Sequence, residues 1–489
     1  MQNEANTIDK ILQQSREAFL VYRNRTGVQK ALFLEAIAAA IEALGEELIR
    51  AAMEETNLPE ARLVGERGRT CNQLRQFAAM TREGSWVEAR IDTALPDRTP
   101  LPKPDLRKMM VPLGPVVVFG ASNFPFAYST AGVDTCSALA AGCTVVLKAH
   151  PAHPRTSDLV AGAIEKAIQS CGEHPHVFQH VHAPSFEGGK MLVQHPLTKA
   201  VGFTGSFSGG KALYDYATAR KEPIPVFAEM GSINPVFILP GALKSRGEQV
   251  AEMYAASITQ GVGQFCTNPG LMLSVQVPEL EGFTRQLAAK IRAVAPATML
   301  HAGIAQNFVK NRGKALKEKG VTLVAESDTP AGANQGIPTV ASVTAGDFLR
   351  NPALTEEVFG PYSLLVISDS REELDKTLDA IPGQLTATVI GDEDELKEYA
   401  GFIQRLSDRV GRVIINGVPT GVEVCPAMHH GGPFPATTDS RFTSVGIDAV
   451  KRWVRPVSFQ NFPHDLLPPE LQNQNPLGIW RMVNNTWMK

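Results

Sequence analysis

One cysteine stands where its neighbours permit chemistry. The stretch "ITQGVGQFCTNPG", residues 258 to 270, places Cys266 after a run of small residues and before Thr267 and Asn268. An accessible thiol with a depressed pKa or a nearby base is a nucleophile. A cysteine in a long chain is more commonly a buried, inert packing residue. Taken singly, Cys266 fits both interpretations.

Two further polar residues follow apolar stretches that read as buried strands. Asn123 lies in "GASNFPF", and its amide can donate to a developing oxyanion, although a turn asparagine before proline explains it equally well. Glu229 ends the apolar run in "FAEMGSINP". A carboxylate in apolar surroundings is expected to have a raised pKa and to serve as a general base. The alternative for Glu229 is an exposed or ion-paired residue at a strand end.

A glycine-rich turn joins a strand to a helix in "KAVGFTGSFSGGKAL", residues 199 to 213. Gly205 and Ser206 precede the helix, and Lys211 lies at its start. Backbone amides at a helix N-terminus bind phosphate. Because the G-x-G-x-x-G pattern is missing, the turn is a moderate indication of a dinucleotide site, and close packing remains an alternative.

Two histidine-rich stretches also bear on chemistry. "HPHVFQHVH" groups His174, His176, His180 and His182, but no acidic or cysteine residue follows at metal-ligand spacing. We therefore predict no metal site. "HHGG", residues 429 to 432, is similar to the oxyanion loop of some hydrolases, yet no G-x-S-x-G elbow accompanies it. We give this stretch no role.

The elements that must position these residues change in character along the chain. Residues 8 to 82 carry apolar positions at helical spacing. From Gly114, short apolar runs alternate with helical stretches, including one at 156–172 with Thr156 or Ser157 as its N-cap. This alternation predicts a parallel sheet covered on both faces, with ligands beyond the carboxyl ends of the strands. Residues 114–230 therefore form the expected nucleotide domain, and a second alternating region follows to about Asn416.

Composition limits the partners. The 489 residues are 44% hydrophobic and 20% charged, with a net charge of -3, which is typical of a soluble protein of two or three domains. We expect no nucleic-acid or membrane partner, and with no signal sequence visible and six cysteines lacking C-x-x-C pairs, a cytoplasmic location. The tail after Arg455 carries Trp480 and Trp487, so we expect it to pack on another domain or subunit.

In their order along nearly the whole chain, these stretches resemble the aldehyde dehydrogenase superfamily. The matching motifs also include "EEVFGP" at 356–361 and "INGVP" at 415–419. The resemblance implies that Cys266 attacks the aldehyde carbonyl, that Asn123 and the Cys266 N–H form an oxyanion hole, and that Glu229 activates the water that hydrolyses the thioester. The cofactor residues that it implies are Lys148, His150, Gly205, Ser206, Lys211, Glu357 and Phe359.

The resemblance also implies an α/β, three-domain fold. A Rossmann-like parallel-sheet cofactor domain would comprise residues 1–92 and 113–230, and an α/β catalytic domain residues 231–445. A small oligomerisation element with the tail would comprise 93–112 and 446–489. The expected assembly is a homodimer or homotetramer.

The cofactor region departs from many relatives. Where these read Lys-Pro-Ser-Glu, this chain reads "KAHPAHPRT" from Lys148, so the carboxylate that would hold a ribose 2′-OH is missing. His150, Arg155 and Lys211 lie nearby in sequence. Loss of the acid admits a 2′-phosphate. We predict NADP as cofactor, with NAD also possible.

The variant segment "HHGGPFPATTDSRFTSVG" looks like the subgroup that contains 2-oxoglutarate semialdehyde (2,5-dioxopentanoate) dehydrogenases of sugar-acid and pentose catabolism. The same subgroup includes NADP-linked fatty aldehyde dehydrogenases, which makes an aliphatic aldehyde the alternative substrate. A cysteine hydrolase is the alternative from another class. A substrate carboxylate calls for an arginine or amides, and Arg441 is a candidate for which a structural salt bridge is an equal explanation.

Overall fold

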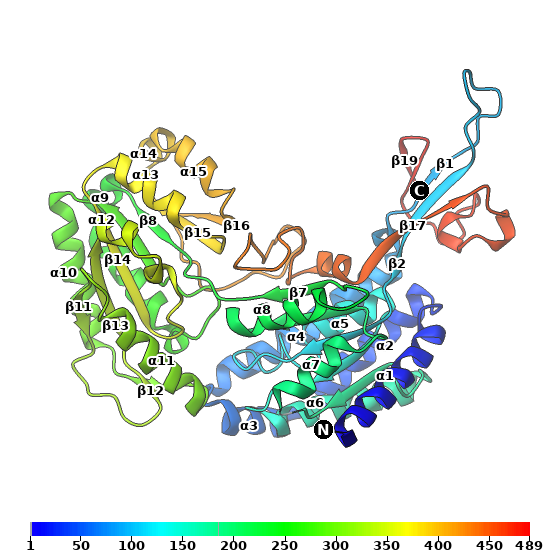
Figure 1. The fold of residues 1–489 in the computed structure, drawn as a ribbon, viewed down its shortest axis with the longest axis horizontal. Helices are drawn as coiled ribbons and strands as arrows, with labels where there is room; N and C mark the ends of the chain where they lie inside the picture. The colour runs from blue at the N-terminus through cyan, green and yellow to red at the C-terminus, as the bar shows by residue number, and fades with distance from the viewer. Residues whose placement is uncertain (1, 184) are drawn as a thin grey trace.

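The computed structural model describes residues 2–183 and 185–489. It has two α/β lobes and a small projecting sheet (Figure 1). The first lobe is built on a five-stranded sheet of order β5-β4-β3-β6-β7 in which all pairings are parallel. Its strands are β3 (Pro115–Phe119), β4 (Thr144–Lys148), β5 (Phe178–Val181), β6 (Ala200–Thr204) and β7 (Val226–Glu229). This is the parallel sheet that the alternating pattern predicts.

Both faces of this sheet are covered because its strands are apolar on both sides. Val116 and Val118 belong to one core with α2, α4, α5 and α6, whereas Val117 and Phe119 belong to another with α1, α7 and α8. The helices are α1 (Gln2–Tyr22), α2 (Gly27–Glu42), α3 (Gly45–Thr56), α4 (Glu60–Glu83), α5 (Val133–Ala141), α6 (Pro154–Cys171), α7 (Phe186–Gln194) and α8 (Phe207–Thr218).

The start of α6 differs from the sequence expectation. The helix begins at Pro154 with His153 as its N-cap, so Thr156 and Ser157 lie inside the first turn. Proline suits the first helical position because it has no N–H to satisfy there. The two hydroxyls instead form tertiary contacts, Thr156 with Glu55 and Ser157 with His180.

The second lobe has a seven-stranded sheet of order β11-β13-β14-β9-β8-β15-β16, in which only the β11 pairing is antiparallel. The strands are β8 (Val236–Ile238), β9 (Leu271–Val275), β11 (Thr322–Glu326), β13 (Thr339–Thr344), β14 (Tyr362–Ser368), β15 (Gln384–Ile390) and β16 (Val410–Ile415). The helices are α9 (Pro240–Thr259), α10 (Pro278–Ala293), α11 (Ala302–Ala315), α12 (Ala345–Arg350), α13 (Arg371–Ala380), α14 (Glu393–Glu398) and α15 (Ala400–Leu406). A two-stranded ribbon pairs β10 (Ala297–Thr298) with β12 (Gln335–Gly336).

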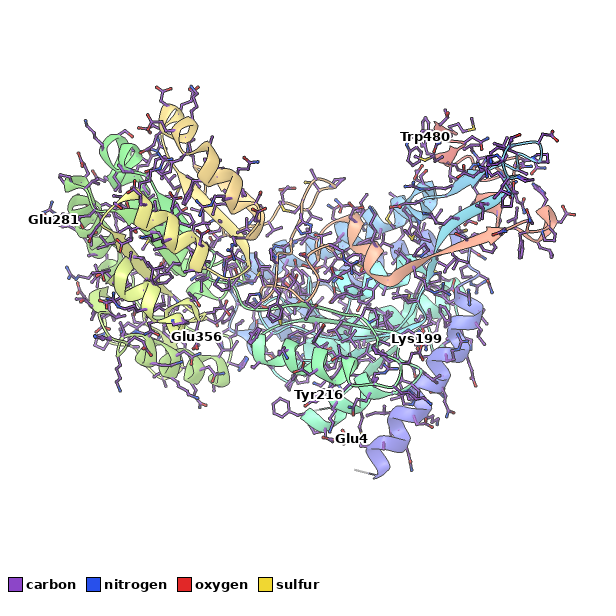
Figure 2. All side chains as sticks on the ribbon, turned by 45° about the horizontal axis from the view of Figure 1, so that its top comes forward. Glu4, Lys199, Tyr216, Glu281, Glu356 and Trp480 are labelled. Atoms are coloured by element: carbon purple, nitrogen blue, oxygen red, sulfur yellow. The ribbon has the colours of Figure 1, made fainter. Side chains whose placement is uncertain are left out.

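The tail forms part of the third sheet. Its order is β17-β2-β1-β18-β19, from β1 (Arg90–Asp92), β2 (Leu106–Pro112), β17 (Val454–Gln460), β18 (Arg481–Val483) and β19 (Thr486–Met488). Trp480 and Trp487 remain 49% and 54% exposed, and Trp480 lies on the projecting sheet (Figure 2). The boundaries at residues 92, 113, 230 and 445 stay predictions. No helix among the described residues is long and apolar enough to cross a membrane.

Candidate active site

The segment before Cys266 has an unusual backbone. Helix α9 ends at Thr259, and Gly261, Val262 and Gly263 follow with φ of 53°, 58° and 63°. A Cβ at Gly263 would lie 2.3 Å from the carbonyl carbon of Gly360. Only glycine fits this close approach in the left-handed region. The glycines in the opening motif therefore bring Cys266 close to the Glu357–Gly360 segment.

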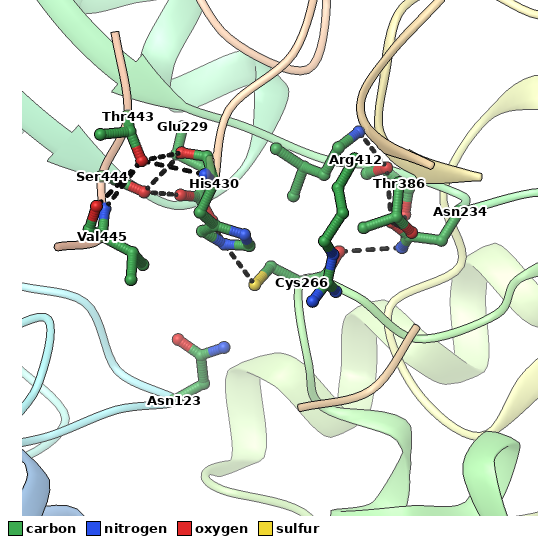
Figure 3. Close-up of polar contacts among 12 residues, drawn as sticks. Asn123, Glu229, Asn234, Cys266, Thr386, Arg412, His430, Thr443, Ser444 and Val445 are labelled. Carbon is green, nitrogen blue, oxygen red and sulfur yellow. Dashed lines mark hydrogen bonds and ion pairs between the residues drawn. The ribbon is translucent and has the colours of Figure 1, made fainter. Parts of the chain in front are cut away.

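The Cys266 loop is held to the second sheet by one buried amide. Asn234 donates through Nδ2 to the carbonyl oxygens of Cys266 and Asn268, each at 2.9 Å. Its Oδ1 accepts from the hydroxyls of Thr386 and Ser232, each at 3.0 Å (Figure 3). A fully satisfied buried network of this kind fixes geometry. The position of the sulfur is thus set from β15 and from the segment that follows Glu229.

Cys266 faces an imidazole and a carboxylate. Its Sγ lies 3.5 Å from His430 Nε2, which lies 3.1 Å from Glu229 Oε1 (Figure 3). The other oxygen, Glu229 Oε2, accepts from the Ser444 hydroxyl at 2.5 Å. Glu229, His430 and Ser444 are all buried. A thiol, an imidazole and a carboxylate in contact form a unit that can move protons.

The surroundings of Glu229 change the expected direction of its pKa. Burial acts to raise it, but His430 and hydrogen bonds from His430, Ser444 and Cys266 outweigh burial, so the pKa of Glu229 lies below its usual value. The expectation of a raised pKa is wrong, because it assumed apolar surroundings. Glu229 is therefore ionised in the resting site and able to accept a proton.

The Cys266 thiol is shifted in the opposite sense. Burial and the adjacent Glu229 carboxylate raise its pKa well above the usual value, and Arg69 acts to lower it. The resting site accordingly holds a protonated thiol beside an ionised carboxylate. Attack on a carbonyl then requires the thiol proton to move, and Glu229 is the adjacent acceptor.

His430 and Ser444 are the residues that sequence reasoning missed. The sequence predicts no role for the stretch "HHGG". This prediction is wrong, because His430 contacts both Cys266 and Glu229. The paired histidines were the available signal, but their distance from Cys266 in sequence conceals the contact. No sequence pattern singles out Ser444.

Asn123 approaches Cys266 from the side opposite Glu229 (Figure 3). Its Nδ2 donates to the carbonyl oxygen of Gln264, two residues before Cys266, at 3.3 Å. Its own carbonyl oxygen accepts from Arg62 Nη2 at 2.6 Å. The Asn123 side chain therefore lies beside the segment that leads into Cys266, and an amide in this place can serve as an oxyanion donor.

The predicted cofactor residues of the first sheet lie along its carboxyl edge. Lys148 ends β4, and His150 follows it, with a ring stacked on His153 at 5.5 Å between centroids. Burial lowers the pKa of His150 to about 3, so this imidazole is neutral. Ser206 caps α8 by accepting from Gly209 N at 3.2 Å, and Gly205 precedes it. Lys211 is ion-paired with Asp215 at 2.6 Å.

The remaining two cofactor residues lie on the second lobe. Glu357 and Phe359 line a cavity together with Ser232, Gly263 and Asn268. The Glu357 carboxylate accepts from Ser232 N at 3.4 Å, and burial raises its pKa to about 7. The N-terminus of α8 on one lobe and the Glu357 carboxylate on the other are the kinds of group that bind the pyrophosphate and a ribose of a dinucleotide. The residues therefore fit NAD or NADP.

The histidine cluster differs in one respect from the sequence prediction. His182 Nε2 contacts Asp158 Oδ1 at 2.7 Å, and His180 Nδ1 lies 3.6 Å from the same oxygen. Folding thus supplies an acidic neighbour that sequence spacing does not show. His180 Nε2 also bonds Ser157 Oγ at 2.7 Å. Hydrogen bonds explain these contacts, and the absence of a metal site stays a prediction.

Arg441 does not face the thiol. Its guanidinium is 79% exposed and forms a two-point ion pair with Asp439. Arg441 therefore forms a structural salt bridge, which is the alternative that the sequence left open. It is not placed to bind a carboxylate of a substrate at Cys266.

Comparison with known proteins agrees with this site. The sequence pattern of the aldehyde dehydrogenase family matches residues 1–436. The chain is 50% identical over 481 residues to alpha-ketoglutaric semialdehyde dehydrogenase 2 of Azospirillum brasilense, covering 97% of this chain and 90% of the relative. It is 47% identical over 478 residues to alpha-ketoglutaric semialdehyde dehydrogenase of Acinetobacter baylyi, covering 98% and 90%.

A solved structure of betaine aldehyde dehydrogenase from Staphylococcus aureus has the same fold. Its TM-score is 0.78 at 18% identity, over 93% of this chain and 89% of that one. This structural likeness confirms the predicted architecture of a parallel-sheet lobe and a second α/β lobe. The matched pattern and the two near-full-length relatives establish that this chain is an oxidoreductase that belongs to the aldehyde dehydrogenase family, whose members oxidise small aldehydes with NAD or NADP.

Proposed function

We propose that this enzyme oxidises 2-oxoglutarate semialdehyde (2,5-dioxopentanoate) to 2-oxoglutarate, with Cys266 as nucleophile and NADP as cofactor. The observation that carries the substrate assignment is the 50% and 47% identity, over nearly the whole chain, to relatives named for this aldehyde. The contact of Cys266 with His430 and Glu229 supports the assignment of the nucleophile.

The first step forms a bond between Cys266 Sγ and the aldehyde carbon. The thiol proton passes to Glu229, which is ionised and hydrogen-bonded to the thiol. The carbonyl oxygen becomes an oxyanion, and the Asn123 amide and the Cys266 backbone N–H donate to it. His430 keeps Glu229 in place through the 3.1 Å contact.

The cofactor would be held across the two lobes. Gly205 and Ser206 would bind the pyrophosphate, Lys148 the adenosine ribose, and Glu357 and Phe359 the nicotinamide ribose. When bound, the oxidised nicotinamide supplies the hydride acceptor that turns the thiohemiacetal on Cys266 into a thioester. Glu357 presents two acceptor oxygens to the ribose hydroxyls only when it is ionised.

Hydrolysis completes the reaction. Once the thiol proton has left Glu229 for solvent, Glu229 removes a proton from a water molecule, which attacks the thioester carbon. The bond from that carbon to Sγ breaks to release the acid, and the proton on Glu229 returns to the departing thiolate. The hydrogen bonds from His430 and Ser444 orient Glu229 for this step.

The test compares initial rates of NADPH formation with 2-oxoglutarate semialdehyde and with a medium-chain aliphatic aldehyde. We expect a far higher kcat/KM for the semialdehyde. A higher value for the aliphatic aldehyde would replace the substrate assignment by the alternative and leave Cys266 in its role. C266A should abolish NADPH formation with either aldehyde, and substantial residual activity would exclude Cys266 as the nucleophile.

The NADP preference rests on the missing carboxylate after Lys148. Three basic residues nearby in sequence give the NADP preference little support: His150 is neutral, Arg155 pairs with Glu54 and Lys211 pairs with Asp215. Lys148 is thus the cation on which a 2′-phosphate would depend. We expect kcat/KM for NADP at least equal to that for NAD in the wild type, and a selective loss with NADP in K148M. A clear preference of the wild type for NAD would contradict the proposal.

The contact between a thiol, an imidazole and a carboxylate would also suit a cysteine hydrolase, the alternative function from another class. The match to the aldehyde dehydrogenase family decides against it. One measurement separates the two functions: a dehydrogenase should form reduced cofactor, and only when an aldehyde is present.

A further inference from the structure

We propose that Arg69, assisted by Arg62, binds the carboxylate of the aldehyde substrate. This inference rests on the proposed function, because it supplies the carboxylate contact that 2-oxoglutarate semialdehyde requires. Both arginines lie on α4, outside the residues that the mechanism uses.

Arg69 is a guanidinium whose hydrogen-bonding capacity is unused. It forms no hydrogen bond or ion pair with any residue that the structure describes, and its Nε is enclosed by protein without a partner. The side chain is half-buried. A charge removed from water in this way is costly unless a partner arrives. A planar fork of N–H groups matches a carboxylate, which can accept two of them.

Aromatic rings hold both guanidinium groups. Arg69 lies over the rings of Phe124 and Tyr128, at 5.9 and 5.8 Å from their centroids. Arg62 lies over Phe124 and Phe265, at 4.8 Å from each. Stacking of this kind occupies the faces of a guanidinium and leaves its N–H edge available. Aromatic rings therefore position both guanidinium groups, and the contacts of Arg69 leave its N–H donors unengaged.

The rings connect this pair to the reacting atoms. Phe124 directly follows Asn123, and Phe265 directly precedes Cys266. Arg62 Nη2 donates to the Asn123 carbonyl oxygen at 2.6 Å. Arg69 is close enough to Cys266 to act on the charge of its sulfur. A short aldehyde bound at Cys266 would thus have this pair within reach of its other end.

The local charge favours an anion. Arg62, Glu66 and Arg69 have the spacing i, i+4 and i+7 and share one face of α4. Glu66 Oε1 is engaged by the backbone N–H groups of Phe126 and Ala127. One carboxylate therefore faces two guanidinium groups, and the excess positive charge lies beside Phe124.

Arg412 and Arg441 are weaker candidates. Arg412 is near Cys266 (Figure 3), but its two terminal nitrogens donate to the carbonyl oxygens of Pro419 and Gly421. Arg441 is exposed and paired with Asp439. Neither offers a free fork.

The experiment measures kcat and KM of R69M and R69K with two aldehydes of five carbons, 2-oxoglutarate semialdehyde and uncharged pentanal. We expect R69M to lower kcat/KM for the semialdehyde by roughly 10- to 100-fold, mostly through KM, and to change that for pentanal by less than about threefold. R69K should lose less, since it keeps a charge without the fork. The Ki of 2-oxoglutarate as an inhibitor of pentanal oxidation should rise in parallel.

R371M is the matched control, because Arg371 stacks on Tyr399 at 4.1 Å on helix α13, away from the active site. It should leave both substrates unaffected. If R69M lowers kcat/KM equally for both aldehydes, or does not lower it for the semialdehyde, the carboxylate role of Arg69 is overturned. If R69M does not fold, R69K decides by the same selectivity.

Failure of the proposed function is distinguishable. If wild-type enzyme does not favour 2-oxoglutarate semialdehyde, succinate semialdehyde and butanal replace the first pair of substrates. A fall in kcat/KM of R69M with succinate semialdehyde but not with butanal would then support the carboxylate site with a different substrate. An equal fall with both aldehydes would reject the site.

Discussion

Glu229 and Glu357 are two buried carboxylates whose pKa values move in opposite directions. Glu229 receives hydrogen bonds from His430, Ser444 and Cys266, and its pKa falls. Glu357 receives one bond, from a backbone N–H, and burial raises its pKa to about 7. Beside Glu229 the electrostatic interaction with His430 and three hydrogen bonds outweigh burial, so burial alone does not decide the charge of the two carboxylates. The two residues can therefore serve different roles at one pH.

His430 should act as a positioning residue for Glu229. In H430N the carboxylate loses a donor while burial remains, so its pKa should rise. Because the ionised form accepts protons, the acidic limb of the kcat profile should move to higher pH, and kcat should fall by roughly 10- to 100-fold. Steady-state rates between pH 5 and 9 measure this. S444A is expected to shift the limb in the same direction, and an H430N profile that keeps the wild-type limb would contradict the role.

Glu357 should make cofactor use depend on pH near neutrality. Its carboxyl group is mostly protonated below pH 7 and ionised above, and only the ionised form offers both oxygens as acceptors to the ribose hydroxyls. From pH 6 to 8, the ionised fraction, and with it kcat/KM for the cofactor, should rise by about tenfold. E357Q cannot ionise and should lose this component of the profile. An unchanged slope in E357Q would assign the titration to another group.

At the scale of elements, the loop between α9 and β9 delivers the thiol. Gly261 to Gly263 turn the chain through left-handed conformations, Gly263 passes against Gly360, and Asn234 holds the Cys266 carbonyl. The sheets contribute the opposite wall, since Glu229 is the last residue of β7. The site thus forms where a rigid strand end meets a tightly constrained loop.

G263A should damage this loop. A methyl group at Gly263 would meet Gly360 at 2.3 Å in a left-handed conformation. The left-handed conformation alone costs about 1–2 kcal/mol, and the contact adds to it. We expect a lower free energy of unfolding in urea and a loss of activity. G282A is the control, because Gly282 lies inside α10 with nothing within 4 Å, and alanine there should stabilise by about 1 kcal/mol.

At the scale of the whole molecule, the site lies between the two lobes, and the third sheet projects beyond them (Figure 1). Glu229 comes from the first lobe, Cys266 from the second, and His430 from the segment that returns toward the first. In the third sheet, β19 pairs only with β18, so its other edge is unpaired among the residues that the structure describes. Exposed tryptophans beside an open strand edge are typical of a contact between subunits.

We predict that this sheet joins copies of the chain in a homodimer or homotetramer. W480D/W487D should lower the molar mass in solution, measured by light scattering after size-exclusion chromatography, because it places charges in the contact. V309D is the control, since Val309 on α11 is 63% exposed outside this sheet. A wild-type protein that is monomeric at tens of micromolar would refute the prediction.

The sequence by itself determined the local and ordered features. Alternating apolar runs predicted the parallel sheet, because strands buried on both faces must be apolar throughout. The order of the motifs around Asn123, Glu229 and Cys266 indicated the family, since these motifs are contiguous stretches of the chain. The expected cofactor residues and domain boundaries follow from the same resemblance and stay predictions.

Only the tertiary structure decided which distant residues meet. His430 follows Cys266 by 164 positions, and Asp158 meets His182 across two separate elements, so neither contact has a spacing that sequence reveals. The sequence predicts the wrong direction for the pKa of Glu229, because its donors come from the Cys266 loop and from the distant segment that carries His430 and Ser444. Arg69 carries no sequence signal for the same reason. Its lack of a hydrogen-bond partner and its contacts with aromatic rings depend on the packing of α4 against the Asn123 segment. Electrostatics depends on distances in space, and folding sets those distances.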